Sequence, residues 1–457
     1  MRIRFVLGAT LAIAAIAFSA RNGRAQGIIA PFAGPVNASM GGASTAAPLD
    51  AIGANYWNPA AISGLSQSEV ALGGQLAFPD IYVSSAFRGQ GATTRSDSGA
   101  LLIPGLALVY RSEDMPRVTV GTGMYVAGGG VNFPGNPSNP IFAPQGPAAR
   151  FVLGPSYGNM AFLQVSSNVS VQVTDRLAIG AGPVIDYCTV NLDPAFFAPA
   201  DDANGDGVRT FPAATHSRPF WGAGFKVGAY YHVTPTIDMG FGYTSPQWLE
   251  TWFFHSRDEL GNPRELSLKA TLPPIYSWGL AYKGIEGLTL ATDLRYIPYT
   301  NATLFGTPVV NGGLGWQDVF AVAVGAQYEF SEKLSARVGY VYNTNPIPTT
   351  GTLFNIQAPA ITQNTISAGA TVRLADNIYS SFAYAYAFQN SISGPVIEAT
   401  AAGTGTTIQT SMHSVFVSLT IRFGGASRCD ADPAPSAATC TPTVDARTPI
   451  ADVNRPQ

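Results

Sequence analysis

Residues 319–330 read VFAVAVGAQYEF, and large apolar side chains alternate along them with smaller or polar ones. Side chains of a β-strand point alternately to opposite faces of a sheet, so this period of two predicts a strand. One face carries Phe320, Val322, Val324, Ala326, Tyr328 and Phe330, and the other carries Val319, Ala321, Ala323, Gly325, Gln327 and Glu329. A soluble β-sandwich also alternates, but its polar face is rich in charge. The polar faces of this chain are mostly Gly, Ser, Ala and Thr, which favours a lumen or a lipid boundary.

The same alternation recurs from residue 68 onwards in fourteen candidate strands. They cover residues 68–83, 99–110, 117–127, 160–173, 176–190, 219–233, 236–254, 264–283, 286–299, 315–330, 333–343, 363–374, 376–390 and 410–423. The eighth contains Pro273 and Pro274, and we expect it to be bent or divided into two pieces, since proline cannot donate a backbone hydrogen bond.

The connections between these segments alternate between short and long. Five are tight turns, at residues 174–175, 234–235, 284–285, 331–332 and 375–376, whereas six are long, at residues 84–98, 128–159, 191–218, 300–314, 344–362 and 391–409. Short turns on one side and long loops on the other are typical of outer-membrane barrels. The sequence therefore predicts an all-β fold, a 14-stranded antiparallel transmembrane β-barrel over residues 68–423, in a Gram-negative type of outer membrane. With an even number of strands, residues 26–67 and 424–457 both begin on the periplasmic side.

Composition supports this fold class and argues against others. Only 12% of the 457 residues are charged, about half of the share in soluble proteins. After the N-terminus no stretch is apolar for the roughly 18 residues that a transmembrane helix needs. The first 25 residues hold four of the 25 basic residues and no acidic one, which leaves 21 basic against 28 acidic residues and a net charge of −7. This acidic balance argues against nucleic acid as a partner.

Residues 1–25 have the pattern of a signal peptide. Arg2 and Arg4 supply the basic start, residues 5–20 form the apolar core, and the small residues of Gly23-Arg24-Ala25 suit a cleavage site. A membrane anchor is the alternative, but the apolar run is short and ends in arginines. We therefore expect the mature chain to begin at Gln26.

Residues 26–67 are expected to form a compact coil ahead of the barrel. Their central part, residues 41–65, is rich in glycine and alanine, and Asp50 is its ionic group. At Asn58-Pro59-Ala60, the asparagine suits a helix N-cap and the proline suits the first helical position. Gly64 then suits the end of a very short helix.

Residues 424–457 are rich in Ala, Pro, Thr and Asp and are predicted to be a disordered periplasmic tail. Cys429 and Cys440 lie in this tail and are expected to form a disulfide in an oxidising compartment, with a pair of free thiols as the alternative. The third cysteine, Cys188, lies at a strand end.

Three stretches carry a family resemblance: residues 41–65 (GGASTAAPLDAIGANYWNPAAISGL), 315–348 (GWQDVFAVAVGAQYEFSEKLSARVGYVYNTNPIP) and 365–388 (TISAGATVRLADNIYSSFAYAYAF). With them, the chain resembles the FadL-type (FadL/TodX) outer-membrane transporters, which carry long-chain fatty acids and other hydrophobic compounds such as aromatic hydrocarbons. The resemblance covers nearly all of the mature chain up to Phe423.

The resemblance implies a monomeric barrel in outer-membrane lipid that needs no cofactor and whose lumen is plugged by residues 26–67, the hatch. Asn58, Pro59 and Ala60 would take part in hatch gating. An apolar ligand would pass from outside to a lumen pocket and leave through a gap in the wall near an interrupted third strand. Here that strand runs into Gly128, Gly129 and Gly130, which suits such a gap, although a flexible start to a long loop is an equal alternative.

The charged residues depart from a fatty-acid carrier, which the resemblance expects to place basic groups in the lumen. Alternation points four basic side chains inward, namely Lys226, Arg295, Arg337 and Arg373. They offer polar contacts for a carboxylate, but buried charges need partners, so we expect them to pair with inward acids, namely Asp186, Asp293 or Glu329. A neutral hydrophobic substrate is therefore the other possibility.

Aromatic residues gather in and beside two outward loops and are candidates for ligand capture. They are Phe196, Phe197, Phe211, Trp248, Trp252, Phe253 and Phe254. We favour capture for Phe196 and Phe197, and the interfacial aromatic girdle for Trp248 and Trp252.

Other motifs are weaker. Residues 202–207 (DANGDG) match the first half of a calcium loop, but the acidic twelfth position falls on Ala213, so a solvated turn is preferred. Residues 154–158 fit GxSxG by letter without the strand and helix that a nucleophile elbow needs. Two other functions stay open: a barrel enzyme acting on lipid, with His413 beside Ser411 and Ser414, and a porin for polar solutes, which would need a charged constriction and no plug.

Overall fold

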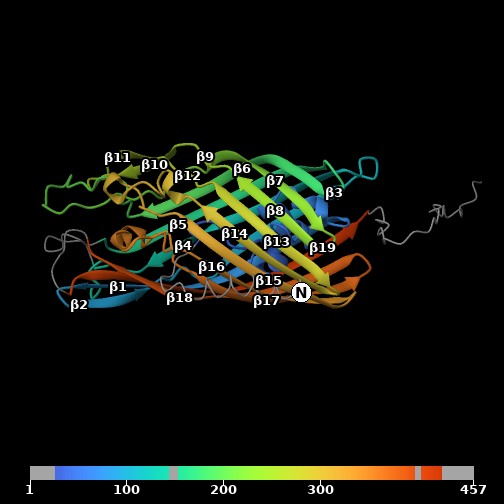
Figure 1. Cartoon of the computed structure of the whole chain (residues 1–457). Helices are drawn as coiled ribbons and strands as arrows, with labels where there is room; N and C mark the ends of the chain where they lie inside the picture. The colour runs from blue at the N-terminus through green and yellow to red at the C-terminus, as the bar shows by residue number, and fades with distance from the viewer. Residues whose placement is uncertain (1–25, 144–152, 397–402, 425–457) are drawn as a thin grey trace, which may run out of the picture. The chain divides into compact units, whose positions relative to one another are not determined.

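The computed structural model describes residues 26–143, 153–396 and 403–424, which belong to one compact unit (Figure 1). The predicted signal peptide, the C-terminal tail beyond residue 424, Cys429 and Cys440 lie outside the described residues.

The described strands form a closed antiparallel barrel with fourteen spanning strands. The barrel closes because β1 pairs with both β3 and β19. The spanning strands are β1 (Ser68–Phe87), β3 (Leu101–Arg111), β4 (Val118–Phe133), β5 (Ser156–Gln172), β6 (Leu177–Asp193), β7 (Phe220–Thr234), β8 (Ile237–Thr244), β13 (Ile275–Ile285), β14 (Leu288–Ile297), β15 (Val319–Ser331), β16 (Leu334–Asn343), β17 (Asn364–Ala375), β18 (Ile378–Gly394) and β19 (Gly405–Phe423).

Short elements extend the sheet or cover its mouth. Strand β2 (Gln90–Arg95), which the sequence analysis missed, returns along the end of β1. Strands β9 (Gln247–Leu249) and β12 (Thr271–Leu272) pair with each other, and β10 (Trp252–Arg257) and β11 (Pro263–Leu268) form a separate hairpin. The loops contain the 3₁₀ turns η2 (Tyr299–Asn301), η3 (Val309–Asn311), η4 (Thr349–Gly351) and η5 (Leu353–Asn355).

Two predicted strands were too long. The segment 236–254 divides into β8, β9 and β10, and the segment 264–283 divides into β11, β12 and β13. Pro273 and Pro274 lie between β12 and β13, so one division falls where backbone donors are missing, although the segment forms three pieces and not two.

The alternation of residues 319–330 has the expected physical basis. On β15, Phe320 is 57% exposed on the outer surface, whereas Ala321 and Ala323 are buried on the lumen side. Large apolar side chains therefore face outward, and small ones face the hatch.

The hatch lies inside the barrel and contains α2 (Gly34–Ser39), α3 (Ala51–Trp57) and the 3₁₀ turn η1 (Ala61–Gly64) (Figure 1, blue). Helix α2 packs against β17 and β18, and α3 packs against β3 and β4. No helix in the described part of the chain is both long and apolar enough to cross a membrane.

The very short helix expected between Asn58 and Gly64 is present as the 3₁₀ turn η1, and a longer helix that was not expected, α3, precedes it. Asp50 is the N-cap of α3 and accepts a hydrogen bond from the Gly53 backbone N–H at 3.0 Å. Asn58 is the C-cap, because Pro59, which cannot donate a backbone hydrogen bond, follows it. After Pro59 the chain makes only the short η1 turn.

Glycines on the inner wall let the hatch backbone come close. A Cβ atom added to Gly240 would overlap the Thr45 carbonyl, one on Gly242 would overlap the Trp57 carbonyl, and one on Gly339 would overlap the Gly41 nitrogen. Further inward glycines meet the hatch in the same way, namely Gly180, Gly228, Gly279 and Gly325. We call these seven residues the glycine belt. The hatch therefore sits directly on the backbone of the wall.

Candidate functional site

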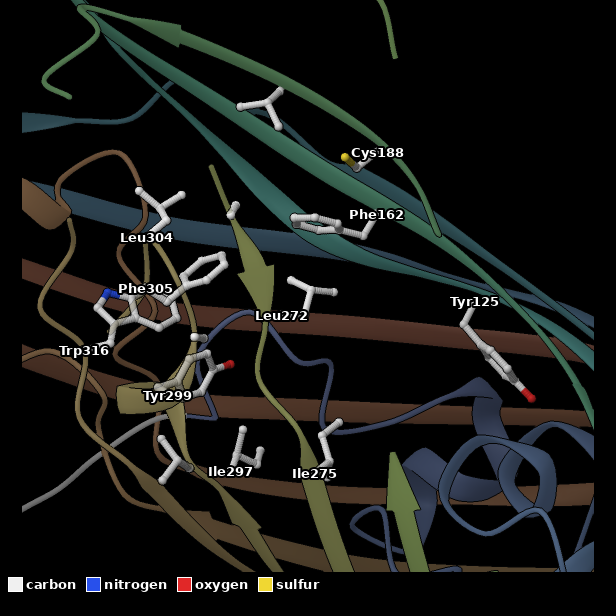
Figure 2. Packing of buried hydrophobic residues seen from close by; sticks show 14 of the residues in the cluster. Tyr125, Phe162, Cys188, Leu272, Ile275, Ile297, Tyr299, Leu304, Phe305 and Trp316 are labelled. Carbon is white, nitrogen blue, oxygen red and sulfur yellow. The ribbon is translucent and has the colours of Figure 1, made fainter. Parts of the chain in front are cut away.

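A cavity of about 260 Å³ lies at the loop end of the lumen, and we call it the chamber. None of the described residues that line it carries a charged side chain. Its wall includes Leu304, Phe305 and Trp316 from the loop between β14 and β15 (Figure 2). Tyr299 packs beside them, with its ring centre 5.0 Å from that of Trp316. The chamber therefore suits an uncharged apolar ligand.

Two hydrogen-bonded contacts hold the roof of the chamber. Trp316 Nε1 donates to Asn355 Oδ1 at 2.6 Å. Gln357 Nε2 donates to the Tyr157 carbonyl at 3.1 Å and to the Pro194 carbonyl at 2.9 Å. The loop between β16 and β17 therefore reaches across the mouth to β5 and to the loop after β6.

The aromatic residues proposed for capture divide into three groups. Phe196 and Phe197 line the chamber, and Phe211 stacks edge-on against Phe196 with ring centres 5.6 Å apart. Trp252 and Phe254 are fully buried and pack around Phe220. Trp248 and Phe253 are exposed.

The girdle interpretation is therefore wrong for Trp252. Its side chain is 0% exposed, because β10 leaves the barrel sheet and pairs with β11, which removes the inside-outside alternation used to place it. Trp248 is 55% exposed and packs near Phe225 on the outer surface, a position that suits a girdle.

The wall has a gap between β3 and β4. Their ladder stops at the Gly105–Tyr125 pair, whereas β4 continues to Phe133 paired with β5 alone among the described strands. Above the gap, Asn132 is bonded to the segment before β3, because its backbone N–H donates to Ser96 Oγ at 2.9 Å. Strand β4 is therefore not interrupted, but one of its edges is unpaired.

Gly128, Gly129 and Gly130 lie on this unpaired stretch and line the chamber together with Leu101 from β3. Gly128 has a φ of 132°, a conformation that side-chain-bearing residues rarely adopt. The chamber therefore extends from Phe197 at the mouth to the gap in the wall.

A second cavity of about 40 Å³ is lined by Ile28, Ile29, Tyr56 and Trp57 of the hatch and by the facing wall. Ile28 lines both cavities, so the N-terminal end of the hatch separates them. This end is held by Tyr299, whose hydroxyl donates to the Gln26 carbonyl at 2.8 Å and accepts from the Ile28 N–H at 2.9 Å. Lys226 lines the second cavity.

The four basic residues differ in their partners. Lys226 is buried and its Nζ donates to the Tyr56 carbonyl at 3.0 Å, and Arg337 Nε donates to Gln327 Oε1 at 2.6 Å. Arg373 lies near the β17–β18 turn and pairs there with Asp376 at 3.3 Å, so it is a rim residue and not a lumen contact.

Of the three acids expected to pair with these basic residues, Asp293 is the one that does so. Arg295 is bonded to Asp293 at 3.0 Å. Asp186 is fully buried and accepts from Gln164 Nε2 at 3.0 Å, and Glu329 accepts from Gln327 Nε2 at 3.0 Å. The wall thus satisfies most of these charges with neutral groups, since amides and carbonyls also meet a buried ion.

Asn58 links two parts of the hatch, at Thr45 and at Ala60, with each other and with the wall. Its Nδ2 donates to the Thr45 carbonyl at 2.8 Å and to the Ala229 carbonyl of β7 at 3.0 Å. Its Oδ1 accepts from the Ala60 N–H at 3.0 Å, and Pro59 lies against the wall at Gly180. Asn58-Pro59-Ala60 therefore connects the hatch to the wall, a role that a helix-capping argument does not predict.

The first and last strands hold α3 from another side. Glu69 on β1 accepts a hydrogen bond from the Ala51 N–H at the start of α3. The other oxygen of Glu69 accepts from Arg422 Nε on β19 at 3.1 Å. The contacts that position α3 (the seat of α3) therefore include the pair of β1 and β19, where the barrel closes.

The His413 and 202–207 motifs are bonded to groups of the chain itself. His413 is exposed and bonded to Tyr384, whereas Ser414 is buried and bonded to Gln75, so they lie on opposite faces of β19. In the 202–207 turn the carboxylates accept from the turn's own backbone, as Asp206 does from Val208 N–H at 2.8 Å. Among the described residues no group of three or more His, Cys, Asp or Glu side chains is placed to hold a metal.

A family model described as "Outer membrane protein transport protein (OMPP1/FadL/TodX)" matches residues 16–423. The chain belongs to this family. The protein is thus an outer-membrane β-barrel transport protein of the FadL/TodX type, a family of transporters of hydrophobic compounds. A search of curated proteins finds no match to this sequence.

Solved structures of the family share the fold. The toluene transporter TodX of P. putida is 16% identical, with a TM-score of 0.66 over 87% of this chain and 100% of that one. The toluene transporter TbuX of Ralstonia pickettii is 17% identical, with a TM-score of 0.65 over 86% and 99%. A Pseudomonas aeruginosa FadL homologue is 16% identical, with a TM-score of 0.64 over 87% and 100%.

For this FadL/TodX-type protein, sequence reasoning missed the residues that shape the chamber and hold the hatch. Trp316 and Tyr299 are examples, although the GWQD sequence before β15 placed an aromatic beside a strand start. The glycine belt had a visible signal, because glycines recur on the inward face of several strands.

Proposed function

We propose that this protein carries small, neutral, hydrophobic molecules passively from the cell exterior into the outer membrane. The observation that carries the proposal is the chamber, an uncharged cavity that reaches from Phe196 and Phe197 to the wall gap at Gly129. TodX and TbuX, which share the fold, are described as toluene transporters, and that description supports a hydrocarbon cargo.

The size and polarity of the chamber favour a small neutral cargo over a long-chain fatty acid. A volume of about 260 Å³ lies below the roughly 300–1,000 Å³ of pockets that take drug-sized ligands. A carboxylate in this chamber would lose its water without gaining a charged partner, which is costly. A molecule with one aromatic ring meets neither obstacle.

The gap supplies the exit in this proposal. If the β3–β4 register is extended beyond its last pair, Gly105–Tyr125, Leu102 on β3 lies opposite Gly128. Leu102 is 73% exposed on the outer surface. An apolar side chain of that exposure at the height of the gap supports an opening into hydrocarbon and not into water. A cargo molecule then leaves sideways, while the hatch keeps the axial path closed.

Capture begins at Phe196 and Phe197, with Phe211 as support, and exit occurs beside Gly128, Gly129 and Gly130. Asn58, Pro59 and Ala60 hold the hatch shut during this passage. The barrel acts alone in lipid, since large apolar side chains cover its outer wall. An enzymatic role has less support, because His413 lacks a bonded serine among the described residues.

The experiment compares uptake of toluene with uptake of a long-chain fatty acid in cells that express the wild type, Gly129→Leu or Gly105→Leu. Both glycines have open space where a side chain would lie, but Gly105 is outside the chamber lining and Gly129 is inside it. We expect Gly129→Leu to lower toluene uptake severalfold and Gly105→Leu to leave it unchanged. Equal uptake by the two variants would refute the wall route, and fatty-acid uptake without toluene uptake would refute a neutral cargo.

A carboxylate cargo is the second candidate, because Lys226 lies in the second cavity behind Ile28. In that case the N-terminal end of the hatch must move before the head group reaches Lys226. Lys226→Met would then weaken binding of a fatty acid about tenfold or more and leave toluene binding unchanged. An equal effect on both ligands would show that Lys226 acts by holding Tyr56 and not by meeting a carboxylate.

A further inference from the structure

Asp293 and Arg295 on β14 hold residues 42–45 of the hatch. Asp293 Oδ2 accepts hydrogen bonds from the Ser44 N–H and the Thr45 N–H, both at 3.0 Å, and from the Thr45 hydroxyl at 2.7 Å. Arg295 Nη2 donates to the same carboxylate oxygen at 3.0 Å and also to the Gly42 carbonyl. One wall carboxylate therefore collects four donors, three of which belong to the hatch.

The same pair also contacts α3, which lies later in the hatch. The Arg295 guanidinium lies 3.7 Å from the ring centre of Trp57 in α3, a distance at which a cation is attracted to the aromatic face. Gly279, opposite Asp293 on β13, leaves room for these contacts, because a Cβ there would lie 2.7 Å from Asp293 Oδ1 and 2.8 Å from Thr45 Cβ. One pair of neighbouring wall residues thus contacts both residues 42–45 and α3.

The pair is dry when the hatch is seated. The side chains of Arg295 and Asp293 are 0% and 1% exposed. Within the described part of the chain, Asp293 Oδ1 and Arg295 Nη1 have no hydrogen-bond partner. Charged groups with unmet hydrogen-bonding capacity gain hydration when water reaches them, and this gain offsets much of the loss of their protein contacts. The contact is therefore strong in the seated state and weak once water enters.

We propose that Asp293 and Arg295 are the positioning residues that lock the hatch, and that its release begins when residues 42–45 leave Asp293. Release lets water into the lumen and opens an axial pathway for small ions, whose exit is separate from the wall gap. The chain thus has a second conduction state that does not depend on which cargo the chamber takes.

The test measures single-channel ion conductance in planar bilayers for the wild type, Asp293→Asn and Asp186→Asn. Asp186 is a matched control, because it is an equally buried wall carboxylate whose hydrogen bond goes to Gln164 of the wall. We expect Asp293→Asn to raise the open probability about tenfold or more, because hydrogen bonds to a charged acceptor are lost, and Asp186→Asn to leave it near the wild-type value.

Thr45→Val supplies an independent arm, because it removes the hydroxyl donor from the hatch and leaves the wall intact. We expect it to raise the open probability by a smaller factor, and we expect the double variant Thr45→Val/Asp293→Asn to open no more often than Asp293→Asn, since both act through one contact. Folding is checked by heat-modifiable migration on gels. If folded Asp293→Asn conducts no more than Asp186→Asn, or if Asp293→Asn does not fold and Thr45→Val conducts as the wild type does, the proposal is overturned.

Discussion

Protonation of Asp50 should control how firmly the hatch is seated. Asp50 belongs to the hatch and is 4% exposed, with the Gly53 N–H as hydrogen-bond donor. Burial, together with the nearby Glu69 carboxylate, raises the pKa of Asp50 from 3.8 to about 7, against the smaller opposing effects of the Gly53 hydrogen bond, Arg337 and Arg422. Asp50 therefore keeps its proton in the seated hatch at a pH at which a hydrated Asp50 has lost it.

The sign follows from proton binding. Between about pH 4 and pH 7 the seated hatch binds more protons than the released hatch, so seating weakens as the pH rises. At 1.36 kcal/mol per pKa unit, the full loss is about 4 kcal/mol, and it is reached above the raised pKa. This loss does not arise in the Asp50→Asn variant, because asparagine accepts the same hydrogen bond from Gly53 and does not ionise.

The assay is ion conductance in planar bilayers from pH 5 to pH 8. We expect the open probability of the wild type to rise with pH across this range and that of Asp50→Asn to stay low and flat. Asp114→Asn is the control, since Asp114 is exposed in the β3–β4 turn and its backbone N–H donates to Ser112 of the same turn. A wild-type profile that coincides with that of Asp50→Asn would refute the reasoning.

Three further predictions concern the belt and the chamber. Gly240→Val should weaken hatch seating by about 1–3 kcal/mol, because the new side chain overlaps the Thr45 carbonyl, and higher ion conductance than in Gly105→Val would show it. Trp316→Ala should lower the free energy of unfolding by about 3–5 kcal/mol, since a buried ring and its bond to Asn355 are lost, and should admit larger hydrocarbons, as thermal unfolding and competition binding would measure. Gln357→Ala should speed toluene binding, because two hydrogen bonds across the chamber mouth, worth about 1 kcal/mol each, are removed, and stopped-flow fluorescence would contradict this if the association rate were unchanged.

The barrel was accessible from the sequence because a strand between two environments has to alternate. Residues 319–330 show this alternation, and β15 places Phe320 outward and Ala321 inward. The alternation fails where the chain leaves the sheet, so Trp252 on β10 was placed on the wrong side. Pro273 and Pro274 marked one such departure in advance, since their missing N–H groups cannot enter a ladder.

The site was less accessible, because its contacts join residues that are far apart in the sequence. Thr45 and Asp293 are 248 positions apart, and no local pattern links them. The position of α3 was predictable in principle, because Asp50 lies three residues before Gly53 and has a suitable capping side chain, but Asn58-Pro59 gave a competing start signal. The chamber depends on loop packing, which has no sequence period.

The contact of Glu69 with both Ala51 and Arg422 has a consequence for biogenesis. Glu69 is on the first strand and Arg422 is on the last, so this part of the seat of α3 is complete only after the final strand has been added. An assembly intermediate that lacks β19 presents α3 with a lone buried carboxylate, which is unfavourable without its guanidinium. We therefore expect docking of the hatch to follow insertion of the last strand, so that a plugged lumen marks a completed barrel.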